Sequence, residues 1–485
     1  MFFAFGLVMA LCFGDERIVL DSAFEDWSGL SPIVRDARDD AGDAGLDIGD
    51  IWITSDREAL YLAFEVQETV NLQVLPGSLE LVLDVDANPE TGLAREAIAG
   101  ADLVVIFTPK NPDRPDAPGM GAALEVATQS GFERRSPYEV GLAQSPTYAS
   151  DRFEVRLQRK PSEGVPALGE RVRARMAFYD GEGERRDVTE IFDYELKQAG
   201  PRVVTAQAKD PLARRDGARL RLMNWNVLWG KVFEDPEPFA RVLRAVDPDV
   251  ITFQELTGDD IEGRLRAWLE KTAPAGAESS WTVNVGDVGG GTLFSAVATR
   301  RPAEVAELRI PARRDRDVMQ SLPALVVKSG DRRTLVISIH LPCCGGIGSP
   351  QDEARLQTVA DLDQALKDWM SENRVTGIIL AGDYNLVGSK QPLTTIVEST
   401  ERLLGRGRSI ELLRLEGSTT ATWRDPKQPF VPGQLDWVVT GGKVDVQGGF
   451  VLDTREVETR WRSLHGLEEG DTDASDHLPL VVDFE

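Results

Sequence analysis

The pattern of apolar residues changes near residue 217, and this change constrains the fold more than any other feature of the chain. Before it, short alternating runs such as IWITS, ALYLAFEV and VRARMAFYD lie between Gly, Pro and Asp. Such runs are typical of an antiparallel β-sandwich. After it, strand-like runs such as DVITFQEL alternate with helical segments such as IEGRLRAWLEKT. We therefore expect an all-β sandwich followed by an α/β domain.

The same change sets the expected domain boundaries. We assign residues 18–200 to the β-sandwich module, 201–217 to a linker that mixes Pro, Gly and charge without periodicity, and 218–485 to the α/β domain. A chain of 485 residues exceeds one ordinary domain, which agrees with a division into two.

The first residues, MFFAFGLVMALCFGDE, form an apolar stretch. It is shorter than the roughly 20 residues that span a bilayer, and its length suits the core of a signal peptide. We therefore expect residues 1–17 to be a signal segment, the protein to be exported to the periplasm or the cell exterior, and no stable membrane span. Because no basic residue precedes the apolar stretch, an ordinary buried strand is the alternative.

Charge and cysteine content limit the classes of partner. The 80 acidic and 54 basic residues give a net charge of −26, which repels polyphosphates at long range and disfavours tight, sequence-independent binding of nucleic acid. Three cysteines cannot form a disulfide framework. Neither the net charge nor the number of cysteines predicts the oligomeric state.

Polar residues stand where several apolar runs of the second half begin or end. In α/β folds this is the usual place for chemistry, because the carboxyl ends of strands meet at one edge of a sheet. The residues, in chain order, are Asn226 in MNWNV, Glu255 in FQE, His340 in ISIHL, Asp383 and Asn385 in GDYN, Asp436 in LDWV, and Asp476 and His477 in SDH.

In this order the motifs resemble those of the endonuclease/exonuclease/phosphatase superfamily, the deoxyribonuclease-like metal-dependent phosphoesterases, over residues 218–485. The resemblance implies a four-layer α/β sandwich, with two packed sheets flanked by helices. It also implies an enzyme that hydrolyses phosphodiester bonds by metal-assisted attack of water, with Mg²⁺ or Mn²⁺ as the cofactor.

The resemblance assigns a role to each residue. Glu255 is the expected metal ligand, together with Asn226 and Asp476, because hard divalent ions prefer oxygen donors. Asp383 is expected to orient and deprotonate the attacking water. The other expected catalytic residues are Asn385 beside that water, His340 and His477 as donors to the phosphate, and Asp436 as the partner that keeps His477 charged.

Each residue taken alone also has a structural explanation. Asn226 could bond backbone at a strand end, Glu255 could cap a helix, and Asp383 with Asn385 could form a turn. Asp476 and His477 could likewise cap a strand. The motifs argue for catalysis because all of them occur in the order of the family.

Residues shared by a whole superfamily do not identify the substrate. We expect a phosphate-ester substrate, with an extracellular or periplasmic nuclease as the first hypothesis. A sphingomyelinase-like phospholipid phosphoesterase, or one acting on inositol phosphates or other small molecules, is the alternative. A hypothesis from another class is a non-catalytic protein that binds a glycan or a partner.

The front domain resembles secreted β-sandwich modules related to carbohydrate-binding modules, through LDSAFEDW and LVLDVDANPETG. The resemblance implies a glycan ligand, and Trp27 and Trp52 could stack on sugars or lie in the core. Asp84, Asp86 and Asn88 alternate in a way that suits either Ca²⁺ or an Asp-rich turn, and the turn is the commoner explanation.

Overall fold

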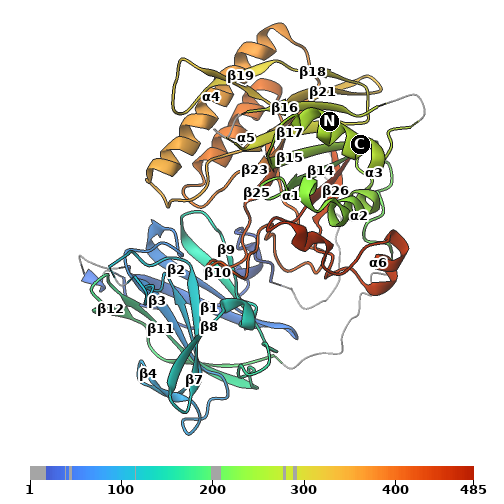
Figure 1. The fold of residues 1–485 in the computed structure, drawn as a ribbon. Helices are drawn as coiled ribbons and strands as arrows, with labels where there is room; N and C mark the ends of the chain where they lie inside the picture. The colour runs from blue at the N-terminus through green and yellow to red at the C-terminus, as the bar shows by residue number, and fades with distance from the viewer. Residues whose placement is uncertain are drawn as a thin grey trace, which may run out of the picture.

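The computed structural model describes residues 18–38, 40–42, 46–114, 116–197, 209–276, 280–287 and 292–485. An all-β domain, blue to green in Figure 1, lies beside a domain of sheets and helices that runs from green to red. The predicted signal segment, residues 1–17, lies outside the described residues, as does 201–208 of the predicted linker.

The front domain is built from two antiparallel sheets. The first has the strand order β1 (Ile48–Ser55), β2 (Ala59–Val70), β10 (Ser150–Gln158), β9 (Ala143–Ser145). The second has the order β12 (Arg185–Val188), β11 (Arg171–Tyr179), β3 (Ser78–Asp84), β6 (Leu103–Phe107), β7 (Ala122–Thr128), β8 (Gly131–Arg135), and β13 (Phe192–Glu195) pairs with β11. A small hairpin joins β4 (Leu93–Arg95) to β5 (Ile98–Ala101). The prediction of a β-sandwich is confirmed.

Alternate residues of β2 pack into two different apolar clusters, one on each side of the first sheet. Leu60, Leu62 and Phe64 belong to the main core, which also contains residues of the second sheet. The intervening Tyr61 belongs to a smaller cluster with Trp27 and Trp52. Those two tryptophans are 1% and 9% exposed, so they are core residues and offer no open platform for a sugar ring.

Two mixed six-stranded sheets form the centre of the rear domain. One has the order β16 (Thr282–Gly286), β17 (Phe294–Thr299), β15 (Val250–Leu256), β14 (Leu220–Asn226), β27 (Leu480–Phe484), β26 (Val446–Val451). The other has the order β18 (Ala303–Val305), β21 (Ala324–Ser329), β22 (Arg332–His340), β23 (Gly377–Asp383), β25 (Asp436–Gly442), β24 (Arg408–Ile410). A separate hairpin pairs β19 (Leu308–Pro311) with β20 (Met319–Leu322).

Helices cover the outer face of each sheet. The helices are α1 (Lys231–Glu234), α2 (Pro236–Val246), α3 (Ile261–Thr272), α4 (Pro350–Glu372), α5 (Gln391–Leu404) and α6 (Thr459–His465). Apolar residues of α2 and α3 pack on the sheet of β14, and those of α4 and α5 pack on the sheet of β22 (Figure 1). A third cluster lies between the sheets. The predicted four-layer sandwich is therefore confirmed.

The strand β14 shows why such strands read as continuous apolar runs. Leu222 belongs to the cluster between the sheets, whereas the next residue, Met223, belongs to the cluster under the helices. Both faces of the strand are covered, so every one of its residues is buried. The polar residues Asn224 and Asn226 on this strand must therefore find partners inside the protein.

A long irregular segment between β24 and β25, residues 411–435, joins the two domains. Gln73 accepts a hydrogen bond from the backbone N–H of Val431 (3.0 Å), and the Tyr138 hydroxyl accepts one from Asp425 N–H (3.0 Å). The backbone of Leu20 pairs with Thr419 in a parallel bridge. The front domain thus contacts a loop that continues directly into β25.

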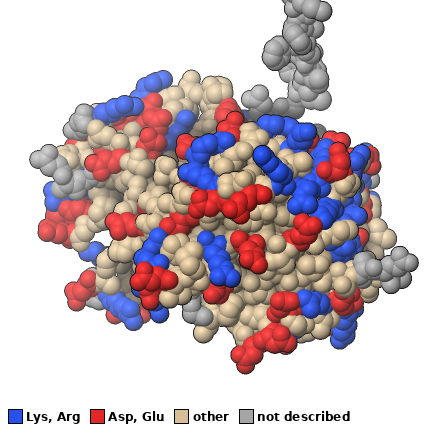
Figure 2. All heavy atoms as spheres, turned by 90° about the horizontal axis from the view of Figure 1, so that it is seen from above, with Lys and Arg blue, Asp and Glu red and all other residues tan. Residues whose placement is uncertain are grey.

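The surface carries both signs of charge. On the face shown in Figure 2, Lys and Arg side chains lie among Asp and Glu side chains, so the acidic excess does not make this face uniformly negative. Among the described residues, no helix has both the length and the apolar character that crossing a membrane requires.

Candidate active site

The topology brings the predicted site residues to one edge of the two sheets. Of the parallel neighbours β14 and β15, the first ends with Asn226 and the second carries Glu255 as its penultimate residue. The parallel neighbours β22 and β23 end with His340 opposite Asp383. The antiparallel β25 begins at this edge, with Asp436 opposite Asp383. Ends of parallel strands meet at one edge, so residues far apart in the chain become neighbours.

A local irregularity in β15 places Glu255. The pairing of β15 with β17 shifts register between Phe253 and Leu256, and Glu255 has a positive φ of 59°. An extra residue in a strand re-aims the side chains beside it, and non-glycine residues adopt positive φ at a cost.

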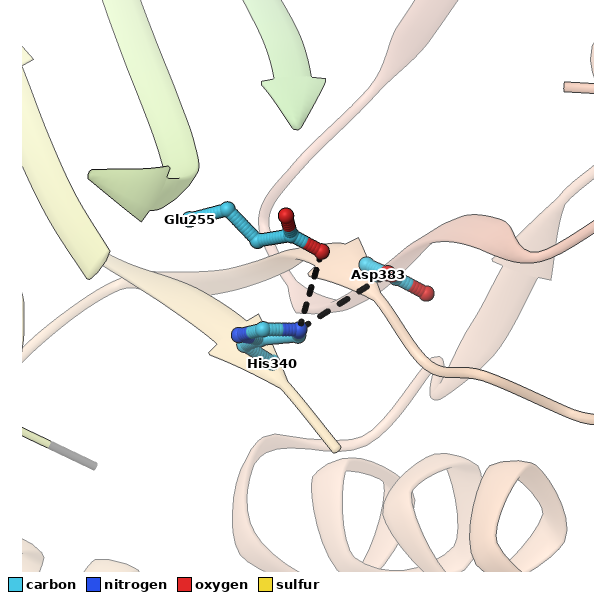
Figure 3. Close-up of side chains that lie close together, drawn as sticks. All are labelled: Glu255, His340 and Asp383. Carbon is cyan, nitrogen blue, oxygen red and sulfur yellow. Dashed lines mark ion pairs between the residues drawn. The ribbon is translucent and has the colours of Figure 1, made fainter. Parts of the chain in front are cut away.

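Glu255, His340 and Asp383 come together at the centre of the site (Figure 3). The Nε2 atom of His340 lies 3.9 Å from Oε1 of Glu255 and 3.9 Å from Oδ2 of Asp383. One ligand atom from each residue lies within 4.8 Å of the others, which is close enough to share one metal ion.

Asn226 lies between the two carboxylates. Its Nδ2 donates to Oε1 of Glu255 (3.0 Å) and to Oδ2 of Asp383 (3.1 Å), while its Oδ1 accepts from the backbone N–H of Leu228 (3.0 Å). A rotation of the amide by 180° would present Oδ1 to the same carboxylates. The residue is therefore placed where a cation shared by Glu255 and Asp383 would need a further oxygen ligand.

His477 and Asp436 form a buried pair on the other side of Asp383. The Nδ1 atom of His477 lies 2.8 Å from Oδ2 of Asp436, and its Nε2 lies 3.6 Å from Oδ2 of Asp383. The hydroxyl of Thr422 also donates to Oδ2 of Asp436 (2.8 Å), and Asn224 donates to Oδ1 (3.2 Å). These bonds hold the carboxylate of Asp436 in place, and that carboxylate in turn orients the imidazole of His477.

Asn385 donates hydrogen bonds to the carboxylate of Asp383 from both its backbone and its side chain. It occupies the left-handed region (φ 47°), its backbone N–H donates to Oδ1 of Asp383 (2.9 Å), and its Nδ2 donates to Oδ2 of Asp383 (3.1 Å) and to the carbonyl of Leu341 (3.0 Å). Asn385 therefore orients the carboxylate of Asp383.

Asp476 is not part of the central group. Its Oδ2 accepts from Nε1 of Trp423 (2.9 Å), and its Oδ1 is buried without a hydrogen-bond partner among the described residues. One oxygen of Asp476 is therefore available for a water or an ion.

The electrostatics of the site differ sharply between the two histidines. Burial, together with the nearby charge of His477, lowers the pKa of His340 to about 4, so His340 is neutral near pH 7. Burial also lowers the pKa of His477, but Asp436 and Asp383 more than reverse this and raise it to about 10. The buried pair of His477 and Asp436 therefore carries a proton throughout the physiological range.

The same burial raises the pKa of Asp383 to about 8, with the charges of Asp436 and Glu255 acting in the same direction and that of His477 against it. Several carboxylates thus crowd a buried space. A divalent cation relieves such crowding, and the donor set of Glu255, Asp383 and Asn226 is rich in oxygen, as Mg²⁺ and Mn²⁺ prefer. The residues present fit the predicted metal.

Several residues of this site carry no signal in the sequence. Thr422 and Trp423 come from the irregular segment 411–435, where no periodicity marks them. Asn224 stands in the MNWN motif and could have been suspected, because a buried strand rarely carries two asparagines.

The exposed ring of Trp229 is a further residue beside the site. Trp229 is 58% exposed, and its backbone N–H donates to Oε2 of Glu255 (3.1 Å). Both Leu228 and Trp229 have positive φ, at 43° and 54°. The backbone of this turn is held in a conformation that non-glycine residues rarely adopt, and the turn exposes the aromatic side chain of the residue whose backbone bonds Glu255.

Comparisons with known proteins concern the rear part of the chain. Residues 223–477 match the sequence profile of the Endonuclease/Exonuclease/phosphatase family. The match begins at Met223, so it assigns no family to the β-rich residues before it. No curated protein sequence is significantly similar to the chain.

Several solved structures are similar to part of the chain. A 3′ phosphatase, NExo, from Neisseria bound to a product DNA hairpin is 18% identical, with a TM-score of 0.40, and covers 55% of this chain and 99% of its own. An AP endonuclease from Archaeoglobus fulgidus is 13% identical, with a TM-score of 0.38 and coverage of 55% and 99%. The human Nocturnin catalytic domain with bound sulfate is 18% identical, with a TM-score of 0.35 and coverage of 55% and 94%.

Proposed function

Because the chain belongs to the endonuclease/exonuclease/phosphatase family and is a metal-dependent phosphoesterase, we propose that it cleaves the phosphodiester bonds of nucleic acid. The observation that carries the proposal is the convergence of Glu255, His340 and Asp383 beside the buried pair of His477 and Asp436. A binding protein without activity would have no use for this concentration of buried ionisable groups, which is costly to fold.

The metal would be held by Glu255, with Asn226 beside it and Asp476 as the more distant predicted ligand. When bound, a divalent ion supplies positive charge against the phosphate oxygens and against the extra charge of the transition state. The remaining chemistry is the work of the side chains.

Asp383 is proposed to orient the attacking water and accept its proton. Its carboxylate is fixed by two hydrogen bonds from Asn385 and one from Asn226, so it cannot turn away from a bound water. A base held in one orientation raises the fraction of encounters that lead to reaction. Burial raises the pKa of Asp383 to about 8, whereas the positive charge of His477, 3.6 Å away, and that of a bound divalent ion would favour the ionised form that a base requires.

The two histidines are proposed to contact the phosphate in different states of charge. His477 is an imidazolium, because its Nδ1–H is held by Asp436, and its Nε2–H is free to donate to a phosphate oxygen or to Asp383. His340 is neutral and lies at the edge of the metal-binding group. It is a weaker donor, suited to a non-bridging oxygen.

Trp229 supports a substrate with a planar ring. Aromatic side chains stack on nucleobases with about 1–3 kcal/mol per base and little dependence on sequence. The backbone N–H of Trp229 bonds the Glu255 carboxylate, so the residue that carries this ring lies beside the proposed metal ligand. The net charge of −26 opposes long-range attraction of nucleic acid, which leaves the short-range contacts to supply the affinity.

The test is a panel of substrates with Mg²⁺, Mn²⁺ or a chelator. It comprises a single-stranded oligonucleotide, plasmid DNA, sphingomyelin, an inositol phosphate and bis(p-nitrophenyl) phosphate. The proposal expects metal-dependent cleavage of the nucleic acids, lost in Asp383→Ala and kept in His465→Ala. His465 is a suitable control because it lies outside the site, paired with Asp210 (2.9 Å).

The other outcomes separate the alternatives. Turnover of sphingomyelin or inositol phosphate alone would reject the nuclease and establish a lipid or small-molecule phosphoesterase. Folded protein that cleaves none of the substrates would favour the non-catalytic hypothesis.

We also propose that the protein is exported, on the strength of the apolar composition of its first residues. Cell fractionation with sequencing of the mature amino terminus tests this, because export predicts a chain that begins near residue 18 outside the cytoplasm.

A further inference from the structure

Three aspartates of the front domain meet at one end of its second sheet. Asp84 is the last residue of β3, Asp86 follows in the next turn, and Asp102 precedes β6, the strand that pairs with β3. One carboxylate oxygen from each lies within 4.8 Å of the others. The sequence shows the alternation of Asp84, Asp86 and Asn88, but nothing in it points to Asp102, which the pairing of β3 with β6 brings in.

The carboxylate of Asp84 is buried, and only one of its two oxygens has a hydrogen-bond partner among the described residues. Asp84 is 0% exposed; its Oδ1 accepts from the backbone N–H of Asn88 (3.1 Å), while its Oδ2 has no hydrogen-bond partner among the described residues. A buried carboxylate oxygen without a partner is costly, and native proteins rarely leave one in that state. This orphan oxygen belongs to a carboxylate that already faces two others.

Among the described residues, no basic side chain forms an ion pair with these three aspartates. Arg173 is the partner of Asp84 in the register of β11 and β3, and its charge acts on Asp84, but its guanidinium pairs with Asp193 (2.9 Å). The three carboxylates therefore face one another without a cation paired to any of them.

Hydrogen bonds from nearby backbone N–H groups and one hydroxyl hold the carboxylates of Asp102 and Asp86 in place. Asp102, 7% exposed, accepts from the N–H of Val85 (2.9 Å), and Asp86 accepts from the N–H of Asn88 (3.0 Å) and the hydroxyl of Thr91 (3.0 Å). Each carboxylate is thus fixed by a neighbour. Burial, together with the charges of Asp86 and Asp84, raises the pKa of Asp102 to about 6, as expected for acids crowded without a cation.

We propose that Asp84, Asp86 and Asp102 form a Ca²⁺ site in the front domain. Calcium takes six to eight oxygen ligands at about 2.3–2.6 Å and tolerates irregular geometry, so it can bridge oxygens up to 4.8 Å apart. Magnesium requires shorter bonds, of about 2.0–2.1 Å, and a regular octahedron. The ion would join the turn after β3 to the strand β6 and would stabilise the sheet at this end.

The site is independent of catalysis. Its residues lie on β3, the turn after it and the start of β6, whereas the catalytic group lies on β15, β22 and β23. Two metal sites in one chain, one structural and one catalytic, can therefore be separated by substitution.

The experiment titrates Ca²⁺ into chelator-treated full-length protein and follows binding by calorimetry and unfolding by heat. Asp86→Asn is the informative variant, because Asp86 is exposed and Asn keeps an oxygen that can accept the hydrogen bonds from Asn88 and Thr91. The proposal expects Ca²⁺ affinity to fall at least about tenfold in Asp86→Asn, and further in Asp84→Asn, with loss of the rise in Tm that Ca²⁺ causes in the wild type.

Two controls complete the experiment. Asp113→Asn, an exposed aspartate of the same domain, should leave both quantities unchanged, and Glu255→Gln should keep the Ca²⁺-dependent rise in Tm although it disturbs the catalytic site. Wild-type protein that binds no Ca²⁺, or binding that persists in Asp86→Asn and Asp102→Asn, would overturn the proposal. Loss of binding in Glu255→Gln alone would assign the ion to the catalytic site and equally reject it.

Discussion

Both domains bury a carboxylate deeply, and the two carboxylates have different surroundings. In the rear domain, Asp436 accepts hydrogen bonds from Asn224, Thr422 and the imidazole of His477. In the front domain, Glu154 accepts from Nε1 of Trp27 (2.9 Å) and from the backbone N–H of Ser22 (3.0 Å). Asp436 has a cationic partner, whereas Glu154 forms no ion pair with any residue in the described parts of the chain.

The pKa values follow this difference. Burial raises the pKa of Glu154 to about 8, and the two hydrogen bonds only partly oppose this, so the acid is protonated at neutral pH. In the rear domain the protonated member of the buried pair is the base, His477. The comparison teaches that a buried acid is a functional charge where the fold also buries its cation, and a neutral core residue where it does not.

The largest expected effect is on the functional pair. In Asp436→Asn, the neutral amide no longer favours the imidazolium of His477, and we expect kcat to fall by about 10²–10⁴, the range by which removal of a general acid or base slows an enzyme. Steady-state kinetics on the nucleic-acid substrate measures this.

Asp210→Asn provides the matched control. Asp210 is the partner of His465, the histidine outside the site, so this variant should keep its activity. An Asp436→Asn variant as active as the wild type would show that the buried pair has only a structural role.

The next effect concerns the exposed aromatic ring. In Trp229→Ala, loss of a stacking surface worth about 1–3 kcal/mol should raise KM for an oligonucleotide roughly tenfold or more, while KM for bis(p-nitrophenyl) phosphate changes less. Trp229→Phe should retain most of the affinity. If Trp229→Ala raised KM equally for an oligonucleotide and for its abasic counterpart, the proposal that Trp229 stacks on a base would be wrong.

A smaller effect is expected where the two domains meet. The Tyr138 hydroxyl accepts from the N–H of Asp425, next to the residues that hold Asp436 and Asp476. Tyr138→Phe removes one hydrogen bond, worth about 1 kcal/mol, and we expect a few-fold lower kcat with a slightly lower Tm. A loss of stability without any loss of kcat would mean that the front domain does not help to position the catalytic loop.

The last effect concerns stability and not activity, and it sharpens the account of the front domain. Since the pKa of Glu154 rises from 4.5 to about 8 on folding, the native state keeps a proton that the unfolded state has released between these values. The free energy of unfolding contributed by Glu154 therefore decreases as pH rises from about 4.5 to 8, by up to about 1.4 kcal/mol per pH unit. Denaturant unfolding of Glu154→Gln should lack this part of the slope, and an unchanged slope would contradict the prediction.

The strand ends could be predicted because each apolar run stops at a polar residue. The runs that end at Glu255, His340 and Asp383 match β15, β22 and β23, whose parallel order brings these residues together. The division into an all-β domain and a four-layer domain was equally visible, because the period of the apolar residues changes from one domain to the other.

Other parts carried no local signal. Thr422 and Trp423 reach the site from an irregular segment held by the front domain, and Asp102 joins Asp84 only through strand pairing. The strand β26 contains two glycines, which weaken a strand pattern, and it was not predicted. The predicted position of Asp476 beside the metal stays a prediction, since its carboxylate is bonded to Trp423.

The most direct test of the central claim is the rate of Mg²⁺-dependent oligonucleotide cleavage by His477→Gln and His465→Gln, measured beside the wild type. The two variants remove one histidine each, the first from the buried pair at the site and the second from an ion pair outside it. We predict a loss of at least about 10² in kcat for His477→Gln and none for His465→Gln, with both proteins folded. Equal rates in the two variants would contradict the assignment of catalysis to this site.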